Sequence, residues 1–157
     1  MDFKQYLFLR ESVLAHCCAD APMPPAERVN PVVLAYIGDA VFSLYTRLRL
    51  APSADHVRVL HDVNARMVSA VMQSKAMALL EKDLSEEEAR AFHRGRNAGV
   101  SLPKSASPAE YHEATGFEAL IGYLLLKGRS QRLSDILDRS FDVIAAAMAE
   151  SLPAREP

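Results

Sequence analysis

Two apolar, helix-like stretches of this chain each contain a single acidic residue, and this feature constrains the fold more than any other. The first stretch runs from Asn30 to Leu50 and its only acid is Asp39; the second runs from Ala114 to Leu126 and its only acid is Glu118. A carboxylate buried without a partner is costly, and neither acid has a Lys or Arg one helical turn away. The simplest joint solution is that the two carboxylates face each other across a pair of helices and share a divalent cation.

The size and composition are those of one globular domain. The chain has 157 residues, of which 50% are hydrophobic and 24% are charged, and this is enough to bury a core. Its longest apolar run is far shorter than the roughly 18 residues of a membrane span, and its N-terminus mixes acids and bases, unlike a secretion signal. The adjacent Cys17 and Cys18 cannot build a disulfide framework. We therefore expect a cytoplasmic protein that does not enter a membrane.

The spacing of apolar residues predicts helices and no strands. We expect a helix to about residue 21, a proline-rich linker over 21–28, a mostly apolar and therefore buried helix over 30–50, and a long amphipathic helix from 53 or 55 to 82. Capping signals at Ser85 and Ser107 then predict a short helix to about Arg94, an exposed loop over 95–107, and helices over 108–128 and 130–152. The prediction is an all-α fold of five or six helices, with an extension over 1–28, one domain over 29–152 and a tail over 153–157.

The surroundings of the two acids differ. Gly38, a poor helix former, precedes Asp39, and it predicts the close approach of another backbone or of a ligand. An equally good alternative places Asp39 on a solvated polar stripe with Ser43 and Arg47. Glu118 has small residues one turn before and after it, which leaves room beside its carboxylate and favours a partnered acid over a surface one.

A basic segment offsets the overall charge of the chain. The formal net charge is -2, which argues mildly against a nucleic-acid-binding protein. Residues 89–109, however, contain no acid and include Arg90, His93, Arg94, Arg96 and Lys104. Such a locally basic segment can bind phosphates, although a solvated charged loop is the simpler interpretation when the segment is taken alone.

The two acidic motifs together resemble the ribonuclease III catalytic domain. They are YIGDAV at 36–41 and FEALIG at 117–122, about 80 residues apart. The resemblance is closer to the short Mini-III branch and covers residues 29–137. Its further elements are LAYIGDAVF at 34–42, Leu60-His61, ARMVSA at 65–70 with Gln73, RGRNA at 94–98, Pro103-Lys104 and FEALIGYLLL at 117–126.

The resemblance implies a homodimeric endonuclease that cuts double-stranded RNA with Mg²⁺, for which Mn²⁺ can substitute, and leaves 5′-phosphate products. Asp39 and Glu118 would hold the metal and position the attacking water. Ala35 and Thr115 stand where the larger family has two further acids. Mini-III proteins share these losses, so we expect more water ligands on the ion, which Mg²⁺ tolerates.

The resemblance also implies contacts with RNA and with other molecules. The expected RNA contacts are Arg94, Arg96, Asn97 and Lys104, with Gln73 and Lys75 as further candidates. The apolar faces of the 30–50 and 57–80 segments exceed what one small bundle needs, which fits a dimer. The residues after Gly128 are too few for an appended double-stranded-RNA-binding domain. In the Mini-III group the substrate is precursor large-subunit ribosomal RNA, with a ribosomal protein as helper.

Two other interpretations remain open at this point. The pair His61-Asp62, with His56 nearby, is compatible with a metal-dependent phosphohydrolase of the HD type, although no well-placed further His and Asp complete such a site. A ribonuclease III-like fold that has lost catalysis could instead act as an RNA-binding or ribosome-associated scaffold. The presence of both Asp39 and Glu118 favours the enzyme.

Overall fold

The computed structural model describes residues 2–17, 22–99 and 107–151. These residues form seven α-helices: α1 (Phe3–His16), α2 (Pro31–Leu50), α3 (Val57–Met67), α4 (Ala70–Leu80), α5 (Glu86–Arg96), α6 (Pro108–Leu126) and α7 (Ser130–Glu150). Short 3-10 turns lie at η1 (Ala26–Arg28), η2 (Ala51–Ser53) and η3 (Glu81–Asp83). No strand occurs within these ranges, so the all-α prediction is confirmed. None of the helices in the described part of the chain could cross a bilayer.

The predicted helix starts are present. The side chain of Asn30 accepts a hydrogen bond from the Val32 amide at the start of α2, with proline in the first turn. Ser85 and Ser107 open α5 and α6, and each forms the reciprocal capping box with the glutamate three residues later. Gly128, with φ of 66°, follows the end of α6 in the left-handed conformation that glycine adopts most readily.

The long helix predicted between residues 53 or 55 and 82 is wrong, because α3 and α4 are separate helices. Ser69 has an extended backbone (φ -68°, ψ 151°), and its hydroxyl donates to the Arg66 carbonyl oxygen at 2.8 Å. This break redirects the chain, so that α3 packs against α2 whereas α4 packs against α6 and α7. Hydrophobic periodicity continues across the break and gives no sign of it.

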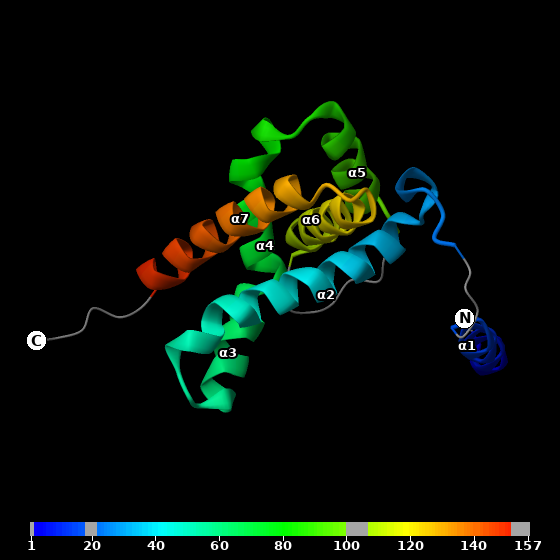
Figure 1. Cartoon of the computed structure of the whole chain (residues 1–157), viewed down its shortest axis with the longest axis horizontal. Helices are drawn as coiled ribbons and strands as arrows, with labels where there is room; N and C mark the ends of the chain where they lie inside the picture. Colours follow the sequence, from blue (N-terminus) through cyan, green and yellow to red (C-terminus); the bar gives the residue numbers. More distant parts are fainter. Residues whose placement is uncertain (1, 18–21, 100–106, 152–157) are drawn as a thin grey trace, which may run out of the picture.

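Helix α6 is the centre of the bundle. It packs against α2, α4, α5 and α7, and Figure 1 shows it enclosed by these four helices. Its residues from Ala114 to Leu124 are buried, apart from Glu118. The edge of one aromatic ring meets the face of another at its crossing with α2, where the centroids of Phe42 and Phe117 are 5.1 Å apart. The core therefore surrounds the helix that contains Glu118.

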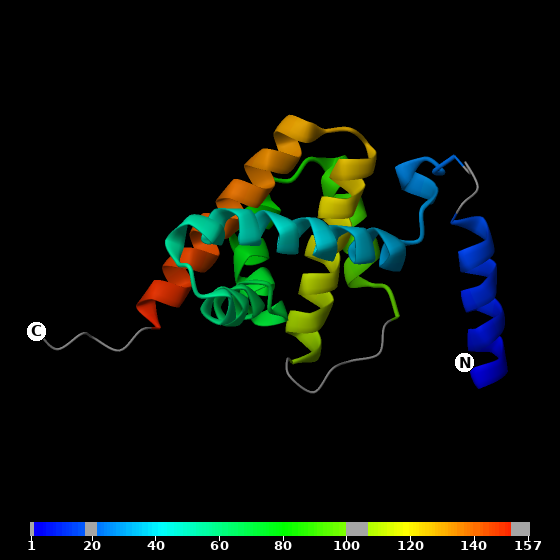
Figure 2. The same ribbon diagram turned by 60° about the horizontal axis from the view of Figure 1, so that its bottom comes forward.

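Helix α1 stands apart from this bundle in both ribbon views (Figures 1 and 2). Five large apolar side chains on it are exposed: Tyr6, Phe8, Leu9, Val13 and Leu14. The bundle itself begins earlier than residue 29, since Ala26 of η1 is buried in a small cluster with Val29, Leu34 and Tyr123.

The expectation that the 30–50 helix is buried on most sides does not hold in the single chain. One side of α2 packs on α6, but the opposite side exposes Val33, Tyr36, Leu44 and Leu48, with Tyr36 80% exposed. These positions fall on one face at helical spacing. The apolar character that predicted burial therefore comes partly from a solvent-facing stripe, which we call the α2 stripe.

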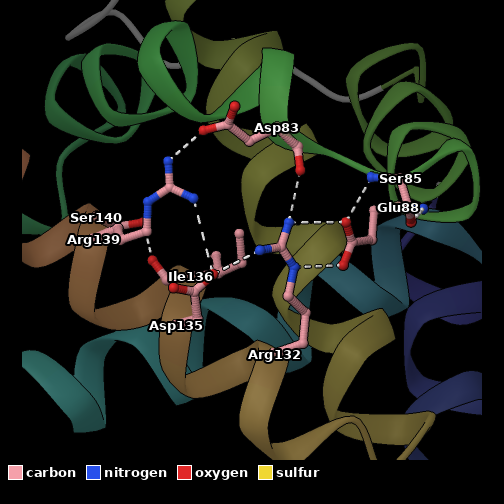
Figure 3. A network of polar contacts seen from close by, with 8 residues as sticks. All are labelled: Asp83, Ser85, Glu88, Arg132, Asp135, Ile136, Arg139 and Ser140. Atoms are coloured by element: carbon pink, nitrogen blue, oxygen red, sulfur yellow. Dashed lines mark hydrogen bonds and ion pairs between the residues drawn. The ribbon is translucent and has the colours of Figure 1, made fainter.

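A charge network fastens α7 to α5 and η3 (Figure 3). The Arg132 guanidinium donates to both Glu88 carboxylate oxygens, at 2.8 and 3.1 Å, and to the Asp83 carbonyl oxygen at 2.9 Å. Glu88 also accepts from the Ser85 amide, so its buried carboxylate is well provided with donors. Burial raises the pKa of Glu88 and the Arg132 hydrogen bonds lower it, with a net shift downward.

Replacing Arg132 by Met is expected to lower the free energy of unfolding by about 2 kcal/mol, because Glu88 would remain buried without its counter-ion. Urea denaturation at neutral pH measures this change. The control is Arg90→Met, which removes an exposed ion pair with Glu86 and should leave stability unchanged. Equal effects of the two variants would contradict a stabilising role for the Arg132 network.

Candidate active site

Two glycines let the backbones of α2 and α6 come into direct contact. A methyl group added at Gly38 would lie 1.8 Å from the Glu118 carbonyl oxygen, and one added at Gly122 would lie 2.1 Å from the Leu34 carbonyl oxygen. Neither position accepts a larger side chain without separating the helices. The sequence predicted that either another backbone or a ligand would come close to Gly38. The structure shows that the backbone of α6 does so. Because Asp39 follows Gly38 directly, this contact brings Asp39 and Glu118 to the same crossing.

The two acids differ in burial. Glu118 is partly buried at the edge of the core, whereas Asp39 is exposed. The sequence left two placements of Asp39 open, a buried one and one on a solvated stripe with Ser43 and Arg47. The structure shows Asp39 exposed, between the buried side of α2 and the α2 stripe. Within the described ranges, neither carboxylate forms an ion pair with a basic side chain.

The environment of Glu118 favours its protonated form when no cation is present. Burial raises the pKa of Glu118 to about 7, and the negative charge of Asp39 adds to the rise. The side-chain amide of Gln73 faces the carboxylate and lowers the pKa, although neither amide atom makes a hydrogen bond of good geometry within the described structure. Repulsion between the two acids is relieved either by a proton or by a cation.

This raised pKa predicts that the metal-free protein loses stability as pH rises. Between about pH 4.5 and 7 the folded chain keeps the Glu118 proton while the unfolded chain releases it, so rising pH favours unfolding. The expected loss over this window is roughly 2 kcal/mol. Urea denaturation in EDTA, at several pH values, measures it.

The Glu118→Gln variant is the control for that measurement, since it removes this group and should show a flatter pH dependence over the same window. An equally steep profile in the variant would show that other groups carry the effect.

Gln73 does not lie where an RNA contact would lie. Its side chain is completely buried on the side of α4 that packs against α6, beside the Glu118 carboxylate. The sequence-based expectation that Gln73 contacts RNA is therefore not compatible with its position. Lys75, two residues later, is exposed and acts electrostatically on Glu110 at the start of α6.

The oxygen donors at the crossing suit a hard cation that keeps most of its water. Two carboxylates and the amide oxygen of Gln73 are ligand types that Mg²⁺ and Mn²⁺ accept. Within the described ranges no three His, Cys, Asp or Glu side chains are grouped to hold a metal. The arrangement therefore fits a partly hydrated ion and not a closed protein cage.

The basic residues at the end of α5 divide into two groups. Arg94 is half-buried and donates to the Val29 carbonyl oxygen at 2.8 Å, so it fastens the segment that leads into α2. Arg96 and Asn97 are exposed at the end of α5, where Arg96 pairs with Glu113 at 2.8 Å. Lys104 lies outside the described residues. Four residues of this segment were expected to contact RNA. Among those that the structure describes, Arg96 and Asn97 have exposed side chains.

Sequence reasoning missed His112, which lies beside these residues. A surface hollow of about 420 Å³ lies between the end of α5 and the start of α6. It is lined by Arg96, Asn97, Ala109 and His112. The Nδ1 atom of His112 is buried and has no hydrogen-bond partner within the described structure. The hollow is thus lined by an amide, an imidazole and a guanidinium that is paired with Glu113, and nothing in the local sequence around His112 signals this.

The HD-type alternative receives no support from the structure. His61 and Asp62 are both exposed on α3, and His56 precedes that helix. The described parts of the chain contain no group of three His, Cys, Asp or Glu side chains that could hold the metal of such a site. His61 instead borders an apolar pocket of about 210 Å³ between α2 and α3.

Comparison with known proteins gives one consistent family. Residues 32–129 match the model of the ribonuclease III domain. The Mini-ribonuclease 3 of Symbiobacterium thermophilum is 46% identical over 117 residues, which are 73% of this chain and 89% of that protein. The Mini-ribonuclease 3 of Thermoanaerobacter sp. is 42% identical over 118 residues, covering 74% of this chain and 83% of the relative.

A solved structure shares the fold. The crystal structure of a protein from Fusobacterium nucleatum superimposes with a TM-score of 0.67 at 28% identity, over 71% of this chain and 90% of that one. The matched family segment contains both Asp39 and Glu118 together with the α2–α6 crossing that joins them. The resemblance inferred from the acidic motifs is therefore confirmed, and the chain belongs to the ribonuclease III family of endoribonucleases.

Proposed function

We propose that this protein cleaves double-stranded RNA with the help of Mg²⁺, and that Asp39 and Glu118 hold the ion. The observation that carries this proposal is the convergence of the two acids at the glycine crossing of α2 and α6, where burial, together with the charge of Asp39, raises the pKa of Glu118. A divalent cation at this point would neutralise both charges, activate a water and stabilise the departing oxygen.

The reaction is hydrolysis of one phosphodiester bond in each strand. The oxygen of water forms a bond to phosphorus while the bond from phosphorus to the 3′ oxygen breaks, and the products carry a 5′-phosphate and a 3′-hydroxyl. Asp39, being exposed, would hold the ion from the solvent side of the crossing. Glu118, being partly buried on α6, would hold it from the side of the core.

Arg96, Asn97 and Lys75 are described residues that we assign to RNA binding. Lys104, which is outside the described residues, remains a contact that the family resemblance implies. Arg96 and Asn97 adjoin the hollow lined by His112, and Lys75 is near the start of α6. A-form RNA presents phosphates and 2′-hydroxyls along a shallow minor groove, and proteins recognise it mainly by shape. Flexible cations and amides suit such contacts. Arg94 donates from one guanidinium nitrogen to the Val29 carbonyl oxygen, and we keep it as a proposed RNA contact beside Arg96.

We further propose that two copies of the chain form a two-fold dimer through the α2 stripe. The stripe and the exposed Val57 and Val59 of α3 form apolar surface that one bundle does not use. Asp39 borders this stripe on α2, so a two-fold axis there would place two centres on one face, each suited to one strand of a duplex.

Introducing charge into the α2 stripe is expected to separate the dimer. The double variant Leu44→Glu/Leu48→Glu should raise the dimer dissociation constant by about a hundredfold or more, because two carboxylates would be desolvated at the interface. Light scattering after gel filtration measures the mass. The control is Leu79→Glu, an equally exposed leucine on α4, which should leave the dimer intact. A wild-type protein that is monomeric at micromolar concentration would refute the proposal.

Precursor large-subunit ribosomal RNA, cut in the stem formed by its paired ends, is the substrate that we propose in the cell, with a large-subunit ribosomal protein as helper. This part rests on the Mini-III resemblance. The primary test uses a long RNA duplex, the same sequence as single strand, and a duplex with DNA in place of RNA. Cleavage of the RNA duplex alone, in Mg²⁺ and not in EDTA, is the expected result. Binding of the duplex without cleavage under any metal condition would favour the scaffold alternative.

A further inference from the structure

Gln73 is the most unusual buried residue of the bundle. Its side chain is 0% exposed, and both its amide oxygen and its amide nitrogen are without a hydrogen-bond partner among the described residues. Leaving a buried polar group unsatisfied is costly, and an apolar side chain of similar length would fit the same space at no such cost. The position of the amide therefore needs an explanation beyond packing.

The surroundings of Gln73 point to the acidic pair. Gln73 shares the buried side of α4 with Ala76, Met77 and Leu80, and this side packs against α6. Its amide is near enough to Glu118, one turn before Gly122 on α6, to lower the pKa of that carboxyl. Gln73 is completely buried, whereas Glu118 is partly buried and Asp39 is exposed.

Other buried polar groups near the crossing already have partners. The Thr115 hydroxyl donates to the Tyr111 carbonyl oxygen at 3.0 Å, and the Thr46 hydroxyl donates to the Asn64 side chain at 2.5 Å. Ala35 has no polar side-chain atom at all. Gln73 therefore remains as a polar side chain next to Glu118 whose hydrogen-bonding capacity is unused.

We propose that Gln73 is a positioning residue of the cation centre, an inference that rests on the proposed function. When a cation is bound, the Nε2 of Gln73 would donate to one Glu118 carboxylate oxygen and leave the other oxygen free to hold the ion. Its Oε1 would then accept a hydrogen bond from a water of the ion's hydration shell. The amide supplies these contacts without charge, so that the two carboxylates alone balance a divalent ion. Groups that orient a metal-binding carboxylate in this way strongly affect metal affinity.

The test compares Gln73→Met with wild-type protein in the absence of RNA. Mn²⁺ binding is measured by the loss of the free-ion electron paramagnetic resonance signal, and the melting temperature of the metal-free protein is measured in EDTA. The variant is expected to bind Mn²⁺ about tenfold or more weakly, while its metal-free melting temperature equals or exceeds that of the wild type. A merely structural hydrogen bond would give the opposite stability change.

Met77→Leu is the matched control, because it alters another fully buried side chain one turn along α4 without touching a polar group. A Mn²⁺ affinity for Gln73→Met within twofold of wild type would overturn the proposal. If that variant does not fold, Gln73→Asn decides: the shorter amide cannot reach the Glu118 carboxylate and the bound water together, so Mn²⁺ binding should weaken at least threefold, and unchanged or tighter binding would overturn the proposal as well.

Asp39→Asn and Glu118→Gln are measured alongside, so that a failure of the cation centre can be told apart from a failure of the positioning role of Gln73. If both bind Mn²⁺ as the wild type does, the cation centre itself is wrong. If both lose Mn²⁺ while Gln73→Met retains it, the centre stands and only the positioning role of Gln73 fails.

Discussion

Replacing Asp39 by Asn, or Glu118 by Gln, is expected to lower the rate of RNA duplex cleavage by about a thousandfold or more. Each change removes one of two carboxylates that meet at the crossing of α2 and α6, and among the described residues no third His, Cys, Asp or Glu is grouped with them. The rate is measured with excess enzyme on a labelled duplex in saturating Mg²⁺. Both substitutions preserve side-chain size, so folding should be unaffected.

The control for this experiment is Asp62→Asn, which neutralises an exposed carboxylate on α3 away from the crossing and should cleave at the wild-type rate. Duplex binding is followed in parallel by gel shift in EDTA, where all three variants should bind at least as well as wild type, because they lose negative charge. Wild-type cleavage by either crossing variant would refute its assigned role.

Replacing Gly38 by Ala is expected to lower the free energy of unfolding by about 4 kcal/mol or more, which places it among the severest single substitutions. The added carbon would lie 1.8 Å from the Glu118 carbonyl oxygen and 2.7 Å from its carbonyl carbon. Because these atoms belong to a helix backbone, α2 and α6 would have to move apart along their packed length. Urea denaturation followed by circular dichroism measures the loss.

Gly99→Ala provides the comparison, since nothing lies within 4 Å of the added carbon at that position, and stability should not change. A Gly38→Ala protein as stable as Gly99→Ala would mean that the two helices are not in backbone contact in solution. If Gly38→Ala remains folded but binds Mn²⁺ poorly, the separation of the helices has displaced the acids.

Helix starts were predictable from sequence because capping is local. Asn30, Ser85 and Ser107 each bind amides within three residues of themselves, so their structural effect is contained in a short segment. The break at Ser69 was not predictable in the same way. It follows from the different packing partners of α3 and α4, and apolar spacing along one segment does not reveal which neighbours the segment will meet.

The two acids were predictable as a pair, but their environments were not. A lone carboxylate in an apolar helix signals a special role, and Gly38 signals a close approach. Asp39 is exposed because it borders the α2 stripe, which faces solvent. In sequence, the apolar residues of that stripe look like core residues. Only the arrangement of α2 on α6 shows which apolar side faces inward.

Gln73 shows where inference from residue type fails. An amide in a ribonuclease family predicts a surface contact, yet Gln73 is completely buried, and Arg94 makes a hydrogen bond to the Val29 carbonyl oxygen that the sequence did not predict. Both outcomes depend on contacts between segments far apart in the chain. A polar residue at a helical position that otherwise faces the core is the sequence signal that could have identified Gln73.

The contact between the main chains of α2 and α6 has a consequence for protein engineering. The spacing of the two acids is set by peptide groups of neighbouring helices and not by the size of the side chains around them. Redesign of the hydrophobic interior to raise heat resistance, for example at Met67, Met77 or Ile144, can therefore proceed without changing that spacing, provided that Gly38 and Gly122 are retained.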